Sequence, residues 1–222
     1  RLSAIAAVVI IIFFIPYLAS GFSACGKLFA SLFGTSYVTA MLISAAVIVI
    51  YTVMGGFLAA SFTDLIQSII MTAALVVITC FGVAQAGGVE AVVDNAKSMA
   101  GYLSFTQTHD PVSGSASPYP LIKMCSMLAW GLGYFGMPHI LVRFMAIREE
   151  KELTLSRRIA AVWVVISMTV AVCIGMIGNG ISKAGHIPTL EGSASETVIV
   201  QIAGLLSTYG AFAAIVAGLI LA

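Results

Sequence analysis

Residues that could bind a small molecule gather in one apolar stretch between Trp130 and His139. Within this stretch, eight consecutive positions contain four residues that weaken a helix: Gly131, Gly133, Gly136 and Pro138. Each glycine costs a helix up to ~1 kcal/mol, and proline removes one backbone hydrogen bond and clashes with the preceding turn. Trp130 and Tyr134 are four residues apart and therefore share one helix face. Aromatic rings beside loosened backbone favour a binding site for a small solute; the alternative is a kinked helix with Trp130 as packing.

Asp64 is the only acidic residue between Leu28 and Val89. A carboxylate inside an apolar helix costs ~2.5–3.5 kcal/mol on insertion scales, so such a residue is a functional candidate. The alternative is a capping acid near the start of a helix, where the helix dipole favours negative charge. His139, a single histidine near a helix end, is interpreted as a satisfied polar residue rather than a proton relay.

Composition sets the class of protein that holds these residues. Of 222 residues, 60% are apolar and only 9% are charged, which excludes an ordinary soluble enzyme. The net charge of +1 gives no reason to expect a nucleic-acid surface. Six charge-free runs approach or exceed the roughly 20 residues that cross a bilayer: 2–26, 28–63, 65–89, 124–142, 159–182 and 197–222. The chain is therefore predicted to be an all-α, multi-pass membrane protein in contact with lipid.

We predict six transmembrane helices separated by short connections. Uniformly apolar runs of this length are not the alternating strands of a membrane barrel. The expected helices are approximately 2–26, 38–58, 62–86, 121–145, 157–182 and 196–222. The loop 87–120, rich in Gly, Ser and Pro, is predicted to be irregular. The four cysteines show no spacing typical of a metal or redox site, so no cofactor and no resident metal are expected.

The distribution of positive charge predicts the orientation. Five of the ten Lys and Arg residues flank the connection 146–156: Arg143, Arg148, Lys151, Arg157 and Arg158. Cytoplasmic loops carry such an excess, so 146–156 is expected in the cytoplasm and 87–120 outside. The chain begins with Arg1 and stops at Ala222 inside an apolar run, so we expect it to be part of a longer protein.

Three stretches resemble the sodium:solute symporter family, and within it the sodium/proline symporters most. The first, Trp130-Gly-Leu-Gly-Tyr-Phe-Gly-Met-Pro-His-Ile-Leu-Val-Arg-Phe-Met145, is similar to the signature of the sixth core helix. Gly55-Gly-Phe-Leu-Ala-Ala-Ser-Phe-Thr-Asp64 resembles the turn between core helices four and five. Tyr17-Leu-Ala-Ser-Gly21, with Lys27-Leu-Phe29, resembles core helix three.

The resemblance implies a leucine-transporter-type fold of ten core helices in two inverted repeats. The 222 residues would then form part of one transmembrane domain, core helices three to eight. The implied activity is sodium-coupled import of proline by alternating access, with sodium as coupling ion, in the plasma membrane of a bacterium or archaeon. The resemblance thus implies a transporter and not an enzyme.

The resemblance also implies roles for particular residues. Trp130, Tyr134 and Pro138 match positions associated with substrate binding, and Tyr17 matches a position that faces the same cavity. Asp64 matches a position linked to sodium near the cytoplasmic exit.

The chain departs from the sodium/proline pattern at three positions. Met137 stands where Gln is often found, Phe62 where Trp is, and Pro16 where the pattern has no proline. Two alternatives therefore stay open. One is a sodium symporter for another small solute, such as pantothenate, another amino acid or a carboxylate. The other is a membrane sensor module of the same fold.

Overall fold

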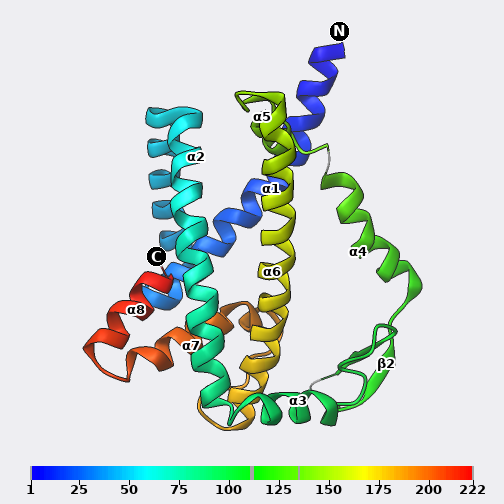
Figure 1. Cartoon of the computed structure of the whole chain (residues 1–222), viewed down its shortest axis with the longest axis vertical. Coiled ribbons are helices and arrows are strands. Elements are labelled where there is room, and N and C mark those ends of the chain that lie inside the picture. Colours follow the sequence, from blue (N-terminus) through cyan, green and yellow to red (C-terminus); the bar gives the residue numbers. More distant parts are fainter. Residues whose placement is uncertain (1, 111–112, 135, 222) are drawn as a thin grey trace. The chain divides into compact units, whose positions relative to one another are not determined.

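The structure, a computed structural model, describes residues 2–110, 113–134 and 136–221, and it is mostly helical (Figure 1). The chain divides into two compact units. One unit contains residues 1–78 and 192–222, and the other contains residues 79–191. Each unit is considered separately below.

The first unit is built from helices alone. Its elements are α1 (Leu2–Phe33), most of α2 (Tyr37–Gln85), the 3-10 helix η1 (Gly192–Thr197), α7 (Val198–Ser207) and α8 (Ala211–Leu221). Helix α7 contacts α1, η1 and α8. Gly26 of α1 is buried, and a methyl group added there would lie 2.9 Å from the ring of Tyr37. A glycine is thus required where α1 meets the start of α2.

Helix α2 covers two of the predicted transmembrane passes. Its two limbs meet at Gly56, where the backbone has φ 58° and ψ −154°, and the chain changes direction there (Figure 1). Only glycine adopts this conformation readily. The change of direction is therefore at Gly56. The expected helices 38–58 and 62–86 left residues 59–61 as the connection between them. Residues 59–61 are instead helical.

The end of the chain is divided where we expected one helix over 196–222. Helix α7 ends at Ser207, and α8 begins at Ala211. The hydroxyls of Ser207 and Thr208 donate to carbonyls of their own helix, at 2.6 and 2.7 Å. Gly210 follows with φ 117°, which lets the chain leave the helix. The interruption therefore has a local cause in the sequence Ser-Thr-Tyr-Gly.

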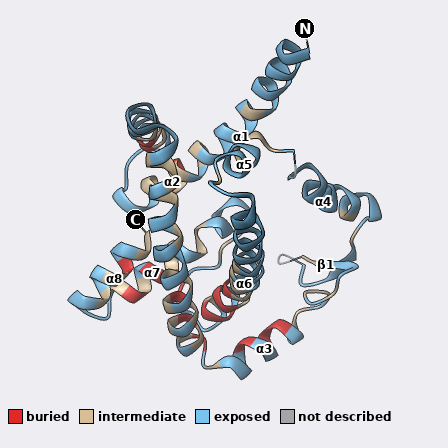
Figure 2. Ribbon diagram, turned by 45° about the horizontal axis from the view of Figure 1, so that its top comes forward, coloured by how far each residue is buried: buried red, intermediate tan, exposed pale blue. Residues whose placement is uncertain are grey.

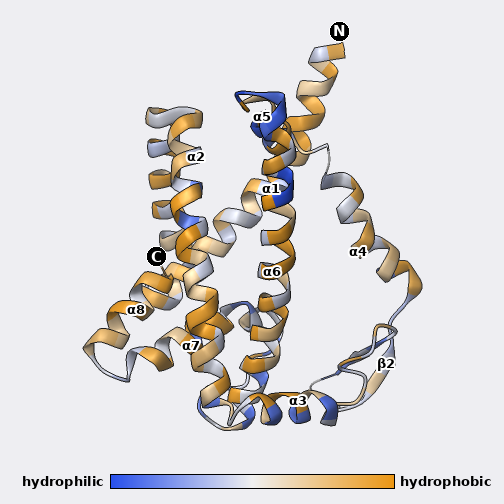
Figure 3. Cartoon of the chain, viewed as in Figure 1, coloured by the Kyte–Doolittle hydropathy of each residue, from blue (hydrophilic) through white to orange (hydrophobic). Residues whose placement is uncertain are grey.

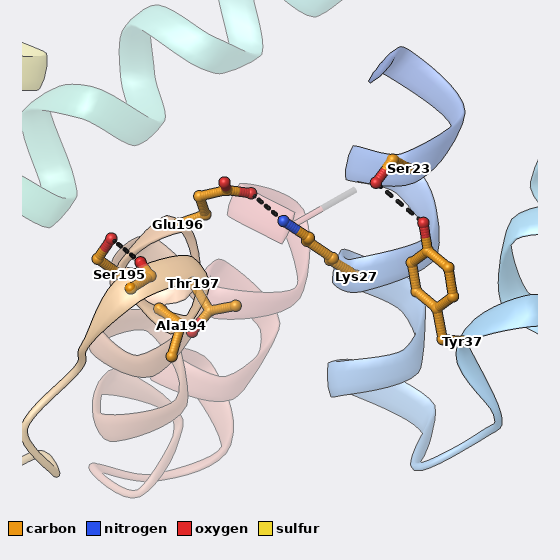
Figure 4. Close-up of polar contacts among 8 residues, drawn as sticks. Ser23, Lys27, Tyr37, Ala194, Ser195, Glu196 and Thr197 are labelled. Atoms are coloured by element: carbon orange, nitrogen blue, oxygen red, sulfur yellow. Dashed lines mark hydrogen bonds and ion pairs between the residues drawn. The ribbon is translucent and has the colours of Figure 1, made fainter. Parts of the chain in front are cut away.

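An ion pair ties α1 to η1 within the first unit. The ammonium Nζ of Lys27 donates to the carboxylate Oε2 of Glu196 at 2.6 Å (Figure 4). On the same side of α1, the Tyr37 hydroxyl donates to the Ser23 hydroxyl at 2.9 Å. No other ion pair is present among the described residues. Both partners are partly exposed, so the pair contributes no more than ~1 kcal/mol.

The second unit contains the last turns of α2 and six further elements, four helices and two strands. These are α3 (Val89–Ser98), β1 (Gln107–His109), β2 (Ala116–Pro118), α4 (Leu121–Tyr134), α5 (Pro138–Met145) and α6 (Glu150–Lys183). Strands β1 and β2 form an antiparallel hairpin. The segment predicted as an irregular loop over 87–120 therefore holds a helix and a hairpin. The predicted loop 146–156 is shorter, because α6 already begins at Glu150.

Buried residues of the second unit gather where α3 packs on the end of α6 (Figure 2). Ile174, Ile177 and Ile181 of α6 are almost fully buried, as is Val92 of α3. Close approach depends on small residues, since a methyl group added to Gly82 would lie 2.6 Å from Cγ2 of Ile177. The core of this unit is therefore at one end of α6, and the rest of that helix is exposed.

Four stretches are long and apolar enough to cross a membrane: Leu2–Phe33, Tyr37–Gln85, Leu121–Met145 and Glu150–Lys183. Most of their residues are hydrophobic, whereas α3 alternates between hydrophobic and hydrophilic residues and the connection before α6 is hydrophilic (Figure 3). Exposed Leu, Ile, Val and Phe side chains cover these helices. Such surfaces are stable against lipid or against other apolar helices, not in water. The chain thus has the surface of a multi-pass membrane protein.

We expect Gly82→Ala to destabilise the full-length protein. The added methyl group would overlap the β-branched side chain of Ile177, which is buried and has little freedom to move. Overpacking of this kind costs about 1–3 kcal/mol, which would appear as a lower midpoint of thermal unfolding in detergent.

Gly175→Ala is the matched control, because nothing lies within 4 Å of a methyl group added at that position of α6. Alanine should raise helix stability there by up to ~1 kcal/mol. Equal loss of stability in both variants would show that contact with Ile177 is not what requires Gly82.

Candidate functional site

The candidate site is an interruption between α4 and α5. Helix α4 ends at Tyr134, and α5 begins at Pro138. The amide of Gly136 donates to the carbonyl of Gly133 at 3.1 Å, and the amide of Met137 donates to the carbonyl of Tyr134 at 3.3 Å. These bonds span three residues instead of the four of an α-helix. Regular backbone hydrogen bonding therefore stops here.

The sequence explains why the chain breaks at this point. Pro138 has no amide hydrogen, so it cannot donate to a carbonyl in the preceding turn. Its fixed φ suits the first residue of a new helix, and Pro138 is indeed the first residue of α5. Met137 before it is extended, with φ −68° and ψ 123°, as expected of a residue that precedes proline. The Met137 carbonyl accepts the amides of Ile140 and Leu141, which starts α5.

The predicted helix-break glycines have open space around them. Nothing lies within 4 Å of a methyl group added to Gly131 or Gly133, and one added to Gly136 would meet only the Gly133 carbonyl, at 3.8 Å. Gly131 and Gly133 lie within α4, whereas Gly136 lies between the helices.

Two aromatic rings stand on α4 beside this open backbone. The side chain of Trp130 is 68% exposed and that of Tyr134 is 51% exposed. The ring of Tyr134 packs edge-on against that of His139, with centroids 6.4 Å apart and planes at 85°. His139 thus bridges the interruption from α5 to α4. That Trp130, Tyr134 and Pro138 bind the substrate stays a prediction.

Tyr17 and Asp64 belong to the other compact unit. Tyr17 is partly exposed on α1, with its ring centroid 5.4 Å from that of Phe14. Its carbonyl accepts the Ser20 hydroxyl at 2.7 Å. That Tyr17 faces the same cavity as Trp130 stays a prediction, as does the role of Asp64 in sodium coupling.

Asp64 is well inside a helix, so the capping alternative is wrong. It follows Gly56 by eight residues, whereas only the first four amides of a helix lack partners. The hydroxyl of Thr63 donates to the carbonyls of Ala59 and Ala60, as a residue within a helix does. Asp64 is half-buried. A carboxylate placed inside an apolar membrane helix is a functional candidate.

Sequence reasoning missed two features, the Lys27–Glu196 ion pair and helix α3. Lys27 was noted only as part of a matching stretch, and its pairing with Glu196 joins residues 169 positions apart, which no local pattern indicates. Helix α3 did carry a signal, because its apolar residues repeat at helical spacing from Val89 through Val92 and Val93 to Ala96.

Among the described residues, no group of three or more His, Cys, Asp or Glu side chains is placed to hold a metal ion.

The chain is similar to several curated transporters over most of its length. It is 41% identical over 177 residues to the osmoregulated proline transporter of Bacillus subtilis, covering 80% of this chain and 34% of that protein. It is 37% identical over 205 residues to the sodium/proline symporter of Salmonella typhimurium, covering 91% and 39%. It is 38% identical over 200 residues to the high-affinity proline transporter of Bacillus subtilis, covering 90% and 40%.

The chain therefore spans about two fifths or less of the length of these relatives. No solved structure shows a significant match to it. The model of one protein family matches every residue from 1 to 222. On this match, the chain belongs to the sodium:solute symporter family.

Proposed function

We propose that the protein containing this chain imports proline together with sodium by alternating access. The observation that carries the proposal is the interruption between Tyr134 and Pro138, with Trp130 beside it. Membrane transporters place substrates at such breaks, where unpaired peptide groups meet polar atoms of the solute. The names of the relatives, two proline transporters and a sodium/proline symporter, support proline and sodium.

Proline suits the chemistry of this segment. Its pyrrolidine ring is apolar and compact, so the rings of Trp130 and Tyr134 could enclose it. Its carboxylate and ammonium need polar partners, which the peptide groups of Gly133, Tyr134, Gly136 and Met137 could supply. The site would need no cofactor, and sodium would be the coupling ion. We place Tyr17 at the same cavity by the family resemblance.

The proposed architecture is the leucine-transporter-type fold, with the chain as core helices three to eight. The limbs of α2 would be core helices four and five, and α7 with α8 would be core helix eight. The positive charges around residues 143–158 favour a cytoplasmic α5–α6 connection and an external position for α3 and the hairpin. The protein would lie in the plasma membrane of a bacterium or archaeon.

A second candidate is a sodium symporter for another small solute. Met137 favours it, because this residue lies in the interruption itself and stands where the sodium/proline pattern often has Gln. An apolar thioether in place of an amide removes one hydrogen-bonding side chain from the site. The solute could then be another amino acid, a carboxylate or pantothenate.

We expect Trp130→Ala to weaken proline transport in the full-length protein. Loss of an exposed indole from the site removes aromatic contact worth about 0.5–1.5 kcal/mol, which is about a two- to tenfold rise in KM for proline uptake. Trp163→Ala, which changes the other tryptophan of the chain, is the matched control. Unchanged kinetics in Trp130→Ala, with a normal amount of protein in the membrane, would place the substrate elsewhere.

We expect Asp64→Asn to weaken the sodium dependence of uptake. The amide keeps the shape of the side chain but removes the negative charge that would attract a cation. A titration of uptake rate against sodium concentration should shift to higher sodium, whereas Asp64→Glu should keep at least part of the wild-type affinity. If Asp64→Asn has the wild-type sodium titration, Asp64 has no part in coupling.

A further inference from the structure

An open cavity lies in the unit formed by residues 79–191. It has a volume of about 350 Å³ and lies between α3 and the C-terminal end of α6. Its polar lining consists of Asp94, Asn95 and Ser98 from α3 and Lys183 from α6. The remaining lining residues are alanines and a glycine. The cavity contains none of the residues of the α4–α5 interruption.

The sequence explains how these residues come to share one cavity. Asp94, Asn95 and Ser98 are spaced so that they lie on one face of α3. Gly180 and Lys183 are similarly spaced on α6. Gly180 is buried, and a methyl group added there would be 3.3 Å from Ala86 and 3.7 Å from Val92. The small residue lets α3 approach α6 while the longer Lys183 side chain reaches the rim.

Two oppositely charged residues of the cavity, Asp94 and Lys183, do not form an ion pair with each other. Asp94 and Lys183 both line it, yet the single ion pair among the described residues is Lys27–Glu196. Asp94 and Lys183 are both exposed. Opposite charges that line one cavity without touching leave room for a molecule that carries both signs.

Asn95 supplies a fixed hydrogen-bonding group at the wall of the cavity. Its side chain is 7% exposed, and its amide Nδ2 donates to Oδ1 of Asn179 at 3.2 Å. This bond sets which way the amide points. The Asn95 side-chain oxygen has no hydrogen-bond partner within the described part of the chain. An acceptor held in this way loses little side-chain entropy when it binds a donor.

We propose that this cavity binds a small zwitterionic solute. Lys183 would pair with the carboxylate, and Asp94 with the Asn95 oxygen would accept the ammonium hydrogens. The volume suits a free amino acid. That the natural ligand is proline rests on the proposed function, whereas the zwitterionic class rests on the cavity alone. The cavity would hold the solute at a place separate from the interruption between α4 and α5.

Protection of a single cysteine tests this directly in purified full-length protein. All native cysteines are replaced by serine, and Ser98→Cys is introduced as a reporter at the cavity wall. Its rate of modification by a small methanethiosulfonate is then measured in potassium buffer without sodium. Proline and glycine should slow the modification. Prolinamide and N-acetylproline, which each carry only one of the two charges, should not.

Variants of the charged residues identify the binding groups. Lys183→Gln and Asp94→Asn should each raise the proline concentration needed for half-protection by about two- to fivefold, the range of a partly exposed charge pair. Lys97→Gln and Glu90→Gln are matched controls on α3, since neither residue lines the cavity. In these controls, the proline concentration needed for half-protection should equal that of the Ser98→Cys protein. Ala184→Cys, at the residue that follows α6 and also lines the cavity, provides a second reporter in case Ser98→Cys does not fold.

Each outcome decides the proposal. Absence of protection on both reporters would overturn it. Protection that requires sodium and disappears in Trp130→Ala would also overturn it, because the effect would then come from the α4–α5 site. Protection without sodium that persists in Trp130→Ala supports it. If this protection is found in a protein that does not accumulate proline, the proposed function fails while the zwitterion site stands.

Discussion

The structure depends on one constraint: within lipid, every backbone amide and carbonyl must have a hydrogen-bond partner. Continuous helices satisfy it, and α6 is one such long helix. Between Tyr134 and Pro138 the regular pattern stops, because Pro138 has no amide hydrogen and the amides of Gly136 and Met137 donate across three residues instead of four. A break of this kind persists where polar groups of a cavity or a solute complete the hydrogen bonding. The proposed substrate site follows from this constraint.

Its position within an apolar helix distinguishes Asp64 from the acidic residues at the start of α6. Glu149, Glu150 and Glu152 lie at the start of α6, where water and the helix dipole stabilise negative charge. Asp64 lies within α2, beyond the turn at Gly56, where neither argument applies. The proposed role of Asp64 in sodium coupling rests on this placement within an apolar helix.

Local sequence rules predicted part of this fold and missed the rest for physical reasons. Apolar runs indicated the membrane class, and the glycines with Pro138 indicated where α4 would be interrupted. Gly55 and Gly56 were part of the expected turn, but the pair does not indicate which glycine takes the unusual backbone conformation, so the helix ends around it were misplaced. Helix α3 was missed because its amphipathic pattern is short and follows two glycines. Contacts such as Lys27–Glu196 join distant positions, so only the folded chain reveals them.

The most direct test of the central claim is proline accumulation by proteoliposomes that contain the full-length protein. An inward sodium gradient, an equal potassium gradient and no gradient are compared at the same membrane potential. The account predicts that proline is concentrated inside only with the sodium gradient, and that a sodium ionophore abolishes this. Proline uptake that is equal with sodium and potassium would contradict coupling. Sodium-driven uptake of a different solute, with none of proline, would contradict the proposed substrate and favour the role of Met137 in a different specificity.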